Sequence, residues 1–283
     1  MINIKYFFQF VIIIFLFMLY KILGLKISNF ISGKIFTLFG PLFRSRKTCH
    51  ENLSFAFPEL DEKERNKILK NMWCNYGKIF AEYIFINKIK NSQRIIVENQ
   101  NILDSIKNES KPVIFISGHF NNFELMAMHI EMSGIDLAAI YRPLNNKFLN
   151  PLMENIRKKY ICKKQIKKGI SGVKEILQNF KNGSSVALMI DQRVSQGIKS
   201  KLFDKDALTT TIPAQFVKKF GTKIVPIYIE RLKNDDFKLK IHEPLEFKTD
   251  ETIEKITSSL NKILEQMIMK NPDQWIWSHN RWK

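Results

Sequence analysis

The sequence predicts an α/β fold: one domain with a mixed, largely parallel sheet flanked by helices, preceded by a hydrophobic anchor helix. Two observations predict it. Short apolar runs, typical of buried strands, alternate with helical segments from about residue 112 to the end of the chain. A separate, longer apolar segment lies near the N-terminus. The 283 residues, 45% of them hydrophobic, are enough for one large core.

The N-terminal apolar segment covers residues 7–25 and reads FFQFVIIIFLFMLYKILGL, with Gln9 and Lys21 as its polar interruptions. As a helix it would be about 28 Å long, which is close to the thickness of the hydrocarbon layer of a membrane. No small-residue cleavage site follows it, which argues against a secretory signal peptide. We therefore expect residues 1–26 to form a membrane anchor and residues 27–283 to form a single catalytic domain.

The distribution of cations around this segment predicts its orientation. Lys5 precedes it, whereas six cations lie near its end or after it: Lys21, Lys26, Lys34, Arg44, Arg46 and Lys47. The positive-inside rule then places the domain in the cytoplasm and the anchor in the inner membrane. The alternative is a helix that lies in the membrane interface, with Lys21 extending its ammonium group to water.

The overall charge indicates an anionic partner. The chain has 45 basic and 27 acidic residues and a formal net charge of +18. No nucleic-acid-binding motif accompanies this charge, so we expect no nucleic acid, and we expect a membrane surface, a phosphorylated substrate or an acidic carrier protein instead. Seven cations crowd one segment, which is either a solvated face or a docking face: Arg157, Lys158, Lys159, Lys163, Lys164, Lys167 and Lys168. The three cysteines are far apart, which excludes a disulfide scaffold and gives no metal spacing.

Two helices are expected between the anchor and the sheet. The first covers residues 27–47, which are semi-apolar. The second covers residues 61–87, with apolar side chains at spacings of three and four. Asp61 followed by Glu64 is the pattern of a capping box at the start of that helix.

Strands and helices then alternate along the chain. The expected strands are residues 112–117, 137–141, 186–190, 224–229 and 237–241. The expected helices are residues 121–132, 146–159, 171–180, 212–220 and 251–269. This order is typical of a largely parallel sheet.

The most informative segment, SGHFNNFE at residues 117–124, follows the first of these strands. Ligands of α/β proteins bind at this edge of the sheet. His119 can accept a proton near neutral pH. Glu124, in the expected helix, could orient the imidazole, which would give the orienting part of a catalytic triad without its nucleophile. The alternative is that His119 is a polar loop residue and Glu124 a solvated helix residue.

Two further strands bring polar residues to the same edge. Arg142 ends the second strand and can bind a phosphate or a developing oxyanion. Asp191 and Arg193 follow the third strand. Arg142 could instead form a surface ion pair, and Asp191 could cap a turn or helix. Polar groups from three strands at one edge favour a functional site.

The motifs GHFNNFE (118–124), YRP (141–143), DQR (191–193), Val225-Pro226 and WSHNRW (277–282) occur in this order. In this the chain resembles the lipid A biosynthesis lauroyl (late) acyltransferase family, part of the glycerolipid acyltransferase superfamily, over nearly its whole length. The resemblance implies that His119 is the general base and Glu124 its partner. It also implies that Arg142 and Asp191 bind the acceptor or the carbonyl group, and we group Asn121 and Arg193 with them as substrate-binding candidates.

The resemblance further implies a membrane-anchored O-acyltransferase with the glycerolipid acyltransferase fold. The donor would be an acyl-carrier-protein thioester, the acceptor a hydroxyl of a phosphorylated glycolipid, the lipid A precursor, and no cofactor or metal is expected. Alternatives are an acyltransferase for a lysophospholipid, an ornithine lipid or another glycolipid, a catalytically silent membrane scaffold, and a thioesterase-like hydrolase.

One segment departs from the pattern of the family, G-x-x-V-x-F-F-G-x-x-A-x-T, at residues 197–209. Gly197, Phe203, Ala207 and Thr209 match, whereas Asp204 stands at a glycine position and Leu202 at the first aromatic position. This departure leaves the acceptor and the acyl-chain length open.

Overall fold

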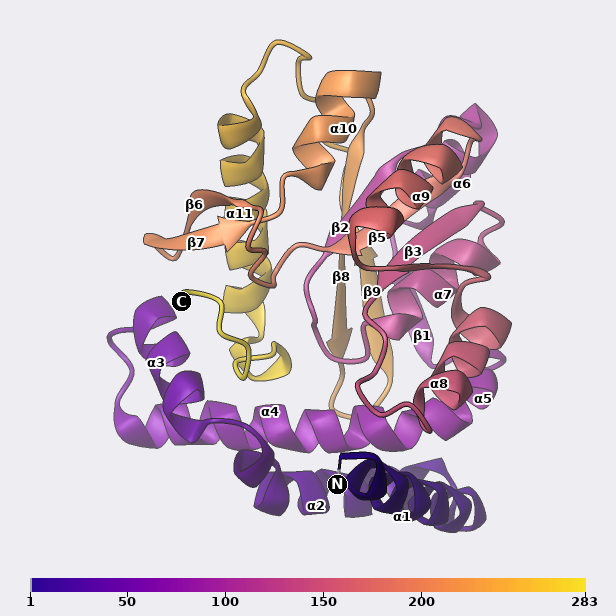
Figure 1. The fold of residues 1–283 in the computed structure, drawn as a ribbon, viewed down its shortest axis with the longest axis vertical. Helices are drawn as coiled ribbons and strands as arrows, with labels where there is room; N and C mark the ends of the chain where they lie inside the picture. The colour runs from indigo at the N-terminus through magenta and orange to yellow at the C-terminus, as the bar shows by residue number, and fades with distance from the viewer. Residues whose placement is uncertain (1) are drawn as a thin grey trace.

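A seven-stranded mixed sheet forms the centre of the protein in the computed structural model, which describes residues 2–283 (Figure 1). Its strand order is β1-β9-β8-β2-β5-β3-β4. The strands are β1 (Ile95–Glu98), β2 (Ile114–Ser117), β3 (Leu137–Tyr141), β4 (Lys164–Lys167), β5 (Ser185–Met189), β8 (Ile224–Arg231) and β9 (Phe237–Ile241). The remaining strands, β6 (Ile198–Leu202) and β7 (Lys205–Thr209), form a separate antiparallel hairpin.

Five neighbouring strands of this sheet run in the same direction. β8, β2, β5, β3 and β4 are parallel, whereas β9 is antiparallel to β8 and β1 is parallel to β9. The carboxyl ends of the five parallel strands therefore meet at one edge. The predicted fold class, an α/β domain with a mixed and largely parallel sheet, is confirmed.

Helices cover both faces of the sheet. On one face lie α9 (Ile170–Lys181), α10 (Ile212–Phe220) and α11 (Ile253–Lys270), and Phe180 of α9 packs edge-on against Phe216 of α10. On the other face lie α6 (Gln100–Glu109) and α7 (Glu124–Met132), joined by a hydrogen bond between Gln100 and His129. The short α8 (Asn150–Ile156) continues into a π-helical turn, Arg157–Ile161.

The carboxyl edge of the sheet faces a base made of long helices (Figure 1). α4 (Glu62–Glu82) lies directly below the edge, and α1 (Ile2–Leu23) and α2 (Leu25–Phe43) lie beneath α4. The predicted capping box of Asp61 and Glu64 opens α4. The expected helix over 27–47 ends earlier, because the chain turns before α3 (Arg46–Ala56), which Ser45 caps. The base is completed by the short 3₁₀ turn Tyr83–Phe85 and α5 (Ile86–Lys90).

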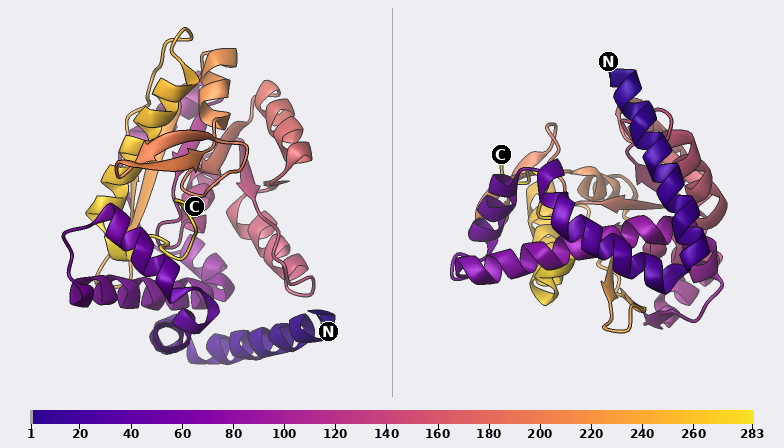
Figure 2. Two further views of the ribbon diagram at one scale, coloured as in Figure 1. Left: turned by 60° about the vertical axis from the view of Figure 1, so that its left-hand side comes forward. Right: turned by 90° about the horizontal axis from the view of Figure 1, so that it is seen from below.

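The N-terminal helix α1 lies along the base rather than projecting from it (Figure 2). Phe17 and Tyr20, near its carboxyl end, are buried against Phe80 of α4. Near its other end the carbonyl oxygen of Tyr6 accepts a hydrogen bond of 2.8 Å from Nδ2 of Asn146. The opposite side of α1 is apolar and exposed, and Asn3–Leu23 is long and apolar enough to cross a membrane.

Candidate active site

Four parallel strands bring polar side chains to the carboxyl edge. His119 follows β2, Arg142 follows β3 and Asp191 follows β5, as predicted. Lys168 follows β4, a strand that the sequence did not predict because its Lys-Gln-Ile-Lys sequence is polar at a sheet edge. The parallel direction of these strands is what gathers residues so far apart in the chain.

His119 and Asp191 form the central pair of the site. Nδ1 of His119 lies 2.8 Å from Oδ1 of Asp191, and the His119 backbone N–H donates to Oδ2 of the same carboxylate at 2.7 Å. Nε1–H of Trp275 donates to that oxygen as well, at 2.9 Å. Burial alone would raise the pKa of Asp191, but the His119 and Trp275 donors lower it to about 2. Asp191 is therefore a buried, ionised carboxylate.

An ionised Asp191 fixes the proton of the neutral imidazole on Nδ1, because the carboxylate only accepts hydrogen bonds. Nε2 of His119 then carries the free lone pair. The amide nitrogen of Gln192 lies 3.4 Å from Nε2, and the ring of Phe123 packs edge-on against the imidazole. The His119 side chain is 19% exposed, and an imidazole with an unprotonated Nε2 has the form that can accept a proton.

Glu124 does not contact His119, which corrects the predicted pairing. Its Oε1 accepts a 2.5 Å hydrogen bond from the Tyr83 hydroxyl and forms a 2.7 Å ion pair with Arg157. The prediction assumed a helix from residue 121, but α7 begins at Glu124 itself. The preceding turn, in which Asn121 has a φ of +41°, directs Glu124 away from the imidazole.

Two predicted substrate-binding residues have structural contacts instead. Asp191 is 1% exposed and is occupied by His119 and Trp275. Asn121 is 2% exposed, and its Nδ2 donates to Oδ1 of Asn75 and Oε1 of Gln274. Both side chains are thus occupied by protein partners: Asp191 pairs with His119, and Asn121 links its loop to Asn75 and Gln274.

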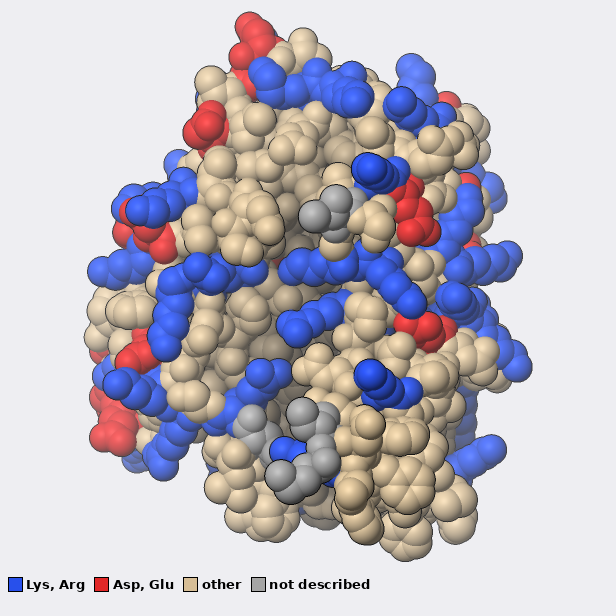
Figure 3. All heavy atoms as spheres, in the orientation of Figure 1, with Lys and Arg blue, Asp and Glu red and all other residues tan. Residues whose placement is uncertain are grey.

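Arg142 and Arg193 differ from these because both are exposed at the edge. Neither forms an ion pair with any residue that the structure describes. Lys168 lies with them, and partial desolvation together with the nearby Arg142 charge lowers the pKa of Lys168. Figure 3 shows Lys and Arg side chains crossing the middle of this face, between the β6–β7 hairpin and α8. The edge therefore has a positive potential that suits an anionic ligand.

The basic segment over residues 157–168 does not form one face. Arg157 is buried with Glu124, and Lys164 forms a 2.6 Å ion pair with Asp136. Lys168 is exposed and lies near enough to Arg142 and Asp191 for their charges to act on it. A single docking surface made of all seven cations is thus not what the fold builds.

Within residues 2–283, no serine, threonine or cysteine side chain hydrogen-bonds to the His119 imidazole, whose partners are Asp191 and Gln192. The hydroxyl of Ser117 donates to the Ile227 carbonyl at 2.6 Å and is buried. Burial raises the pKa of Cys162 to about 12 and that of Cys49 to about 11, so both remain thiols. The same described residues contain no group of three His, Cys, Asp or Glu side chains that could hold a metal ion.

The carboxyl-terminal segment packs against Asp191 and against the β6–β7 hairpin. Trp275 and Trp277 are fully buried and pack at right angles. Nδ2 of Asn52 donates to the Trp277 and His279 carbonyls, and Arg281 binds Thr209 of the hairpin. The role of Trp275 as an Asp191 donor could not be predicted from the sequence, since tryptophan usually indicates only packing.

Comparison with known proteins gives one family. The family model described as bacterial lipid A biosynthesis acyltransferase matches residues 2–283. Lipid A biosynthesis acyltransferase 2 of Shigella flexneri is similar at 23% identity, over 83% of this chain and 76% of the relative. The lipid A biosynthesis lauroyltransferase of Escherichia coli K12 is 25% identical over 85% of this chain and 79% of its own. The lipid A biosynthesis myristoyltransferase of the same strain is 22% identical, over 82% and 73% respectively.

Proposed function

The chain belongs to the bacterial lipid A biosynthesis acyltransferase family, and we propose that it transfers a fatty acyl group from an acyl-carrier-protein thioester to a hydroxyl of a phosphorylated lipid A precursor. Membership of the family makes it an acyltransferase of lipid A biosynthesis. The observation that carries the finer proposal is the His119–Asp191 pair, which leaves Nε2 free beside an exposed cationic edge.

The reaction would proceed by direct transfer. Nε2 of His119 takes the proton of the acceptor hydroxyl while its oxygen attacks the thioester carbonyl. Asp191 stabilises the imidazolium that forms, as the buried carboxylate of a catalytic triad does. When the tetrahedral intermediate collapses, the carbon–sulfur bond breaks and the imidazolium returns the proton to the leaving thiolate. The products are the acylated lipid and the free carrier thiol.

The charges of the site support the two proposed partners. Arg142 and Arg193 are exposed cations without protein partners among the described residues, and guanidinium groups bind phosphate well. A net charge of +18 also favours association with an acidic carrier protein. We assign the phosphate to Arg142 and Arg193 and leave Asp191 to the base.

The membrane is the expected location of the reaction because the acceptor is a lipid. The exposed side of α1 carries apolar side chains, among them Phe8, Ile12, Phe15 and Ile22. The site edge of the sheet faces the layer of long helices to which α1 belongs. Cations that follow α1 favour a cytoplasmic domain at the inner membrane. Because both ends of α1 contact the domain, we favour the arrangement in which it lies in the interface.

The experiment that tests this function is product analysis by mass spectrometry. Purified full-length protein is incubated with an acyl-carrier thioester and a tetra-acylated lipid A precursor, and separately without the acceptor. We expect a mass increase of one acyl group on the precursor, which His119→Ala abolishes. Free fatty acid as the only product would show a hydrolase, and acylation of added lysophospholipid but not the precursor would show a different acceptor. Either result contradicts the proposal.

A further inference from the structure

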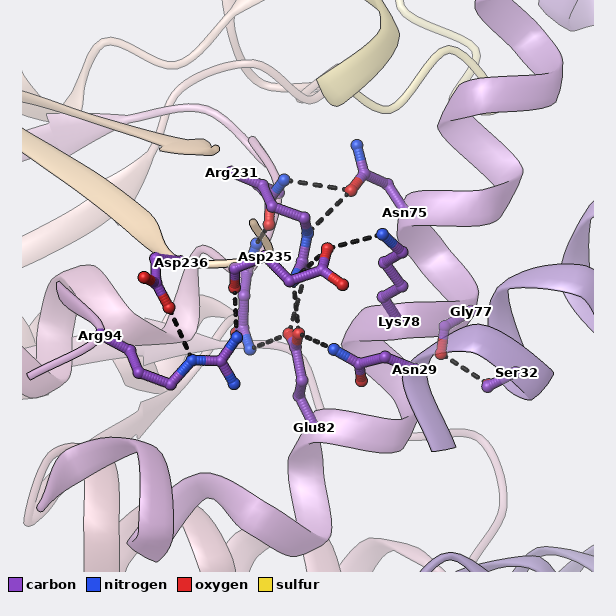
Figure 4. Close-up of polar contacts among 12 residues, drawn as sticks. Asn29, Ser32, Asn75, Gly77, Lys78, Glu82, Arg94, Arg231, Asp235 and Asp236 are labelled. Atoms are coloured by element: carbon purple, nitrogen blue, oxygen red, sulfur yellow. Dashed lines mark hydrogen bonds and ion pairs between the residues drawn. The ribbon is translucent and has the colours of Figure 1, made fainter. Parts of the chain in front are cut away.

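A buried carboxylate outside the catalytic pair joins three parts of the protein. Glu82, the last residue of α4, is 1% exposed and accepts hydrogen bonds on both oxygens (Figure 4). Asn29 of α2 donates to Oε1 at 3.0 Å. Asn122, in the turn after His119, donates to Oε2 at 2.9 Å. Arg231, the last residue of β8, binds both oxygens at 2.5 and 3.0 Å.

The electrostatics of this cluster hold Glu82 in one position. Arg231 is 8% exposed and forms a two-point ion pair with the carboxylate, the geometry that gives such pairs their directionality. Oδ1 of Asn29 and Oδ1 of Asn122 are buried and have no partner among the described residues. Unpaired buried acceptors cost free energy. Both amide groups accept this cost in an orientation that directs their nitrogens to the Glu82 carboxylate, so the carboxylate orients them.

The contact with Asn122 fixes the turn that carries the base. Asn121 lies in the turn between His119 and the start of α7, directly before Asn122. Its φ of +41° is a strained backbone conformation that its surroundings must maintain. The Asn121 amide is held by Asn75 of α4, which also accepts a 3.0 Å hydrogen bond from Nε of Arg231. Glu82 and Arg231 therefore hold this turn from below through both asparagines.

We propose that Glu82 is a positioning residue for His119, acting through Asn122, and that Asn29 makes the membrane-facing helix α2 part of the same support. This inference rests on the proposed function, because it concerns the base of that reaction. Glu82 itself is buried and contacts no reacting atom. Its effect is to keep the turn that carries His119 aligned with Asp191 and with the substrate while α2 is packed on α4.

The central test is the variant Asn122→Ala, which removes one hydrogen bond and leaves the Glu82–Arg231 ion pair intact. We expect kcat for acyl transfer to fall by roughly 10- to 100-fold, because a small misplacement of a catalytic group is costly. KM for the acceptor should change less than about twofold, since the exposed arginines are untouched. Asn29→Ala should lower kcat in the same way but by a smaller factor.

Two neighbouring contacts provide matched controls. Ser32 of α2 donates to the Gly77 carbonyl of α4 at 2.6 Å, and Lys78 of α4 forms an ion pair with Asp235 (Figure 4). The first joins α2 to α4 and the second joins α4 to the connection between β8 and β9, and neither touches Glu82 or Asn122. Asp235 also lies 3.9 Å from Arg231, so Ser32→Ala is the cleaner control of the two. Ser32→Ala and Lys78→Gln should therefore keep kcat within about twofold of the parent, even where the melting temperature falls.

Exchanging the acid and the amide between positions 82 and 122 provides a test by rescue of kcat. Glu82→Gln places a neutral amide against Arg231 and should lower kcat strongly, while Asn122→Asp places two carboxylates together. Combining Glu82→Gln with Asn122→Asp restores one negative charge to the cluster and one donor–acceptor contact of opposite direction. The double variant should recover at least tenfold in kcat over the poorer single variant. Where Glu82→Gln does not fold, Asn122→Ala alone decides the question.

The outcomes separate the two proposals. A parent protein without acyl transfer to any acceptor refutes the proposed function and this inference with it. A parent protein that transfers acyl groups, with Asn122→Ala folded and at parental kcat, overturns the inference alone. If Ser32→Ala lowers kcat as much as Asn122→Ala does, the inference is also overturned. Looser packing of α2 on α4 would then be enough to explain the loss.

Discussion

At the scale of single residues, the sequence predicted the place of His119 at the sheet edge, whereas the structure pairs its imidazole with Asp191 and not with Glu124. His119 stands in a motif directly after a strand, and its position depends only on the strand ending there. The partner depends on the conformation of the next four residues, where α7 begins three residues later than the pattern suggested. Asp191 lies 72 residues away and becomes the partner through parallel pairing of β2 with β5. Such a long-range contact has no local signal in a single sequence.

The contacts of Glu124 predict that it serves folding more than the chemical step. Glu124→Gln keeps the shape of the side chain but leaves Arg157 as a buried cation without its counter-charge. Breaking a buried ion pair typically costs about 3–5 kcal/mol. We expect a clear drop in the melting temperature by differential scanning fluorimetry. We expect kcat of the folded fraction to fall less than about tenfold, and a larger loss in a fully folded protein would contradict the assignment.

His279 predicts a pH dependence of stability. Burial lowers the pKa of His279 from 6.5 to about 4, and the nearby Arg281 charge acts in the same direction against the attraction of Asp191. Between pH 4 and 6.5 the unfolded state thus binds more protons, so stability from this group is complete above pH 6.5 and is lost as the pH falls toward 4.

The measurement is the denaturation midpoint in urea at pH 7.5 and pH 5, for the parent and for His279→Gln. The other half-buried histidines remain in both proteins, so the difference between the two pH dependences isolates His279. We expect a smaller decrease in the variant. An equal decrease in both proteins would show that His279 does not contribute.

At the scale of elements, α2 and α4 approach each other closely at a glycine. A Cβ atom at Gly77 would lie 2.2 Å from the Ser32 carbonyl oxygen, a backbone atom that cannot move without the helix. Gly77→Ala should therefore separate the helices and destabilise the protein by about 1–3 kcal/mol or more. At Gly33 the nearest atom to an added Cβ is the Cys74 sulfur, at 3.0 Å, so Gly33→Ala is the milder control. Equal stability of the two variants would contradict the close packing of α2 on α4.

The elements that the sequence predicted share one property, which is a buried apolar face. β2 and β8 are apolar along most of their length and were found with nearly their observed bounds. β1 and β4, the two outer strands of the sheet, were missed for different reasons. β4 reads Lys-Gln-Ile-Lys and has no apolar run, whereas the apolar run of β1, Ile-Ile-Val, is only three residues long. The β6–β7 hairpin was missed because its strands are rich in lysine.

At the scale of the whole molecule, the site edge and the apolar base face the same side. The sequence predicted an apolar N-terminal helix but gave no means of placing it against the domain. The structure adds contacts at both of its ends, from Phe80 to Phe17 and from Asn146 to Tyr6. These contacts favour a helix that lies in one leaflet and brings the carboxyl edge close to lipid headgroups.

This arrangement predicts the accessibility of the N-terminus. In Asn3→Cys, a membrane-impermeant maleimide should label the new thiol in inverted inner-membrane vesicles and not in intact spheroplasts. The parent protein measures the background from Cys49, Cys74 and Cys162, of which Cys49 and Cys162 are buried. Labelling from the periplasmic side of spheroplasts would show that α1 spans the bilayer and that its contact with Asn146 is broken in the membrane.

The measurement that tests the central claim most directly is the steady-state kcat of Asp191→Asn with an acyl-carrier thioester and a tetra-acylated lipid A precursor, beside His119→Ala. Asparagine keeps the size of the side chain but removes the charge that stabilises the imidazolium and fixes its tautomer. We predict that both variants remain folded and that kcat falls by roughly 10²- to 10⁴-fold in each, with KM little changed. A folded Asp191→Asn or His119→Ala protein that transfers acyl groups at nearly the parental rate would contradict the assignment of the His119–Asp191 pair as the catalytic base.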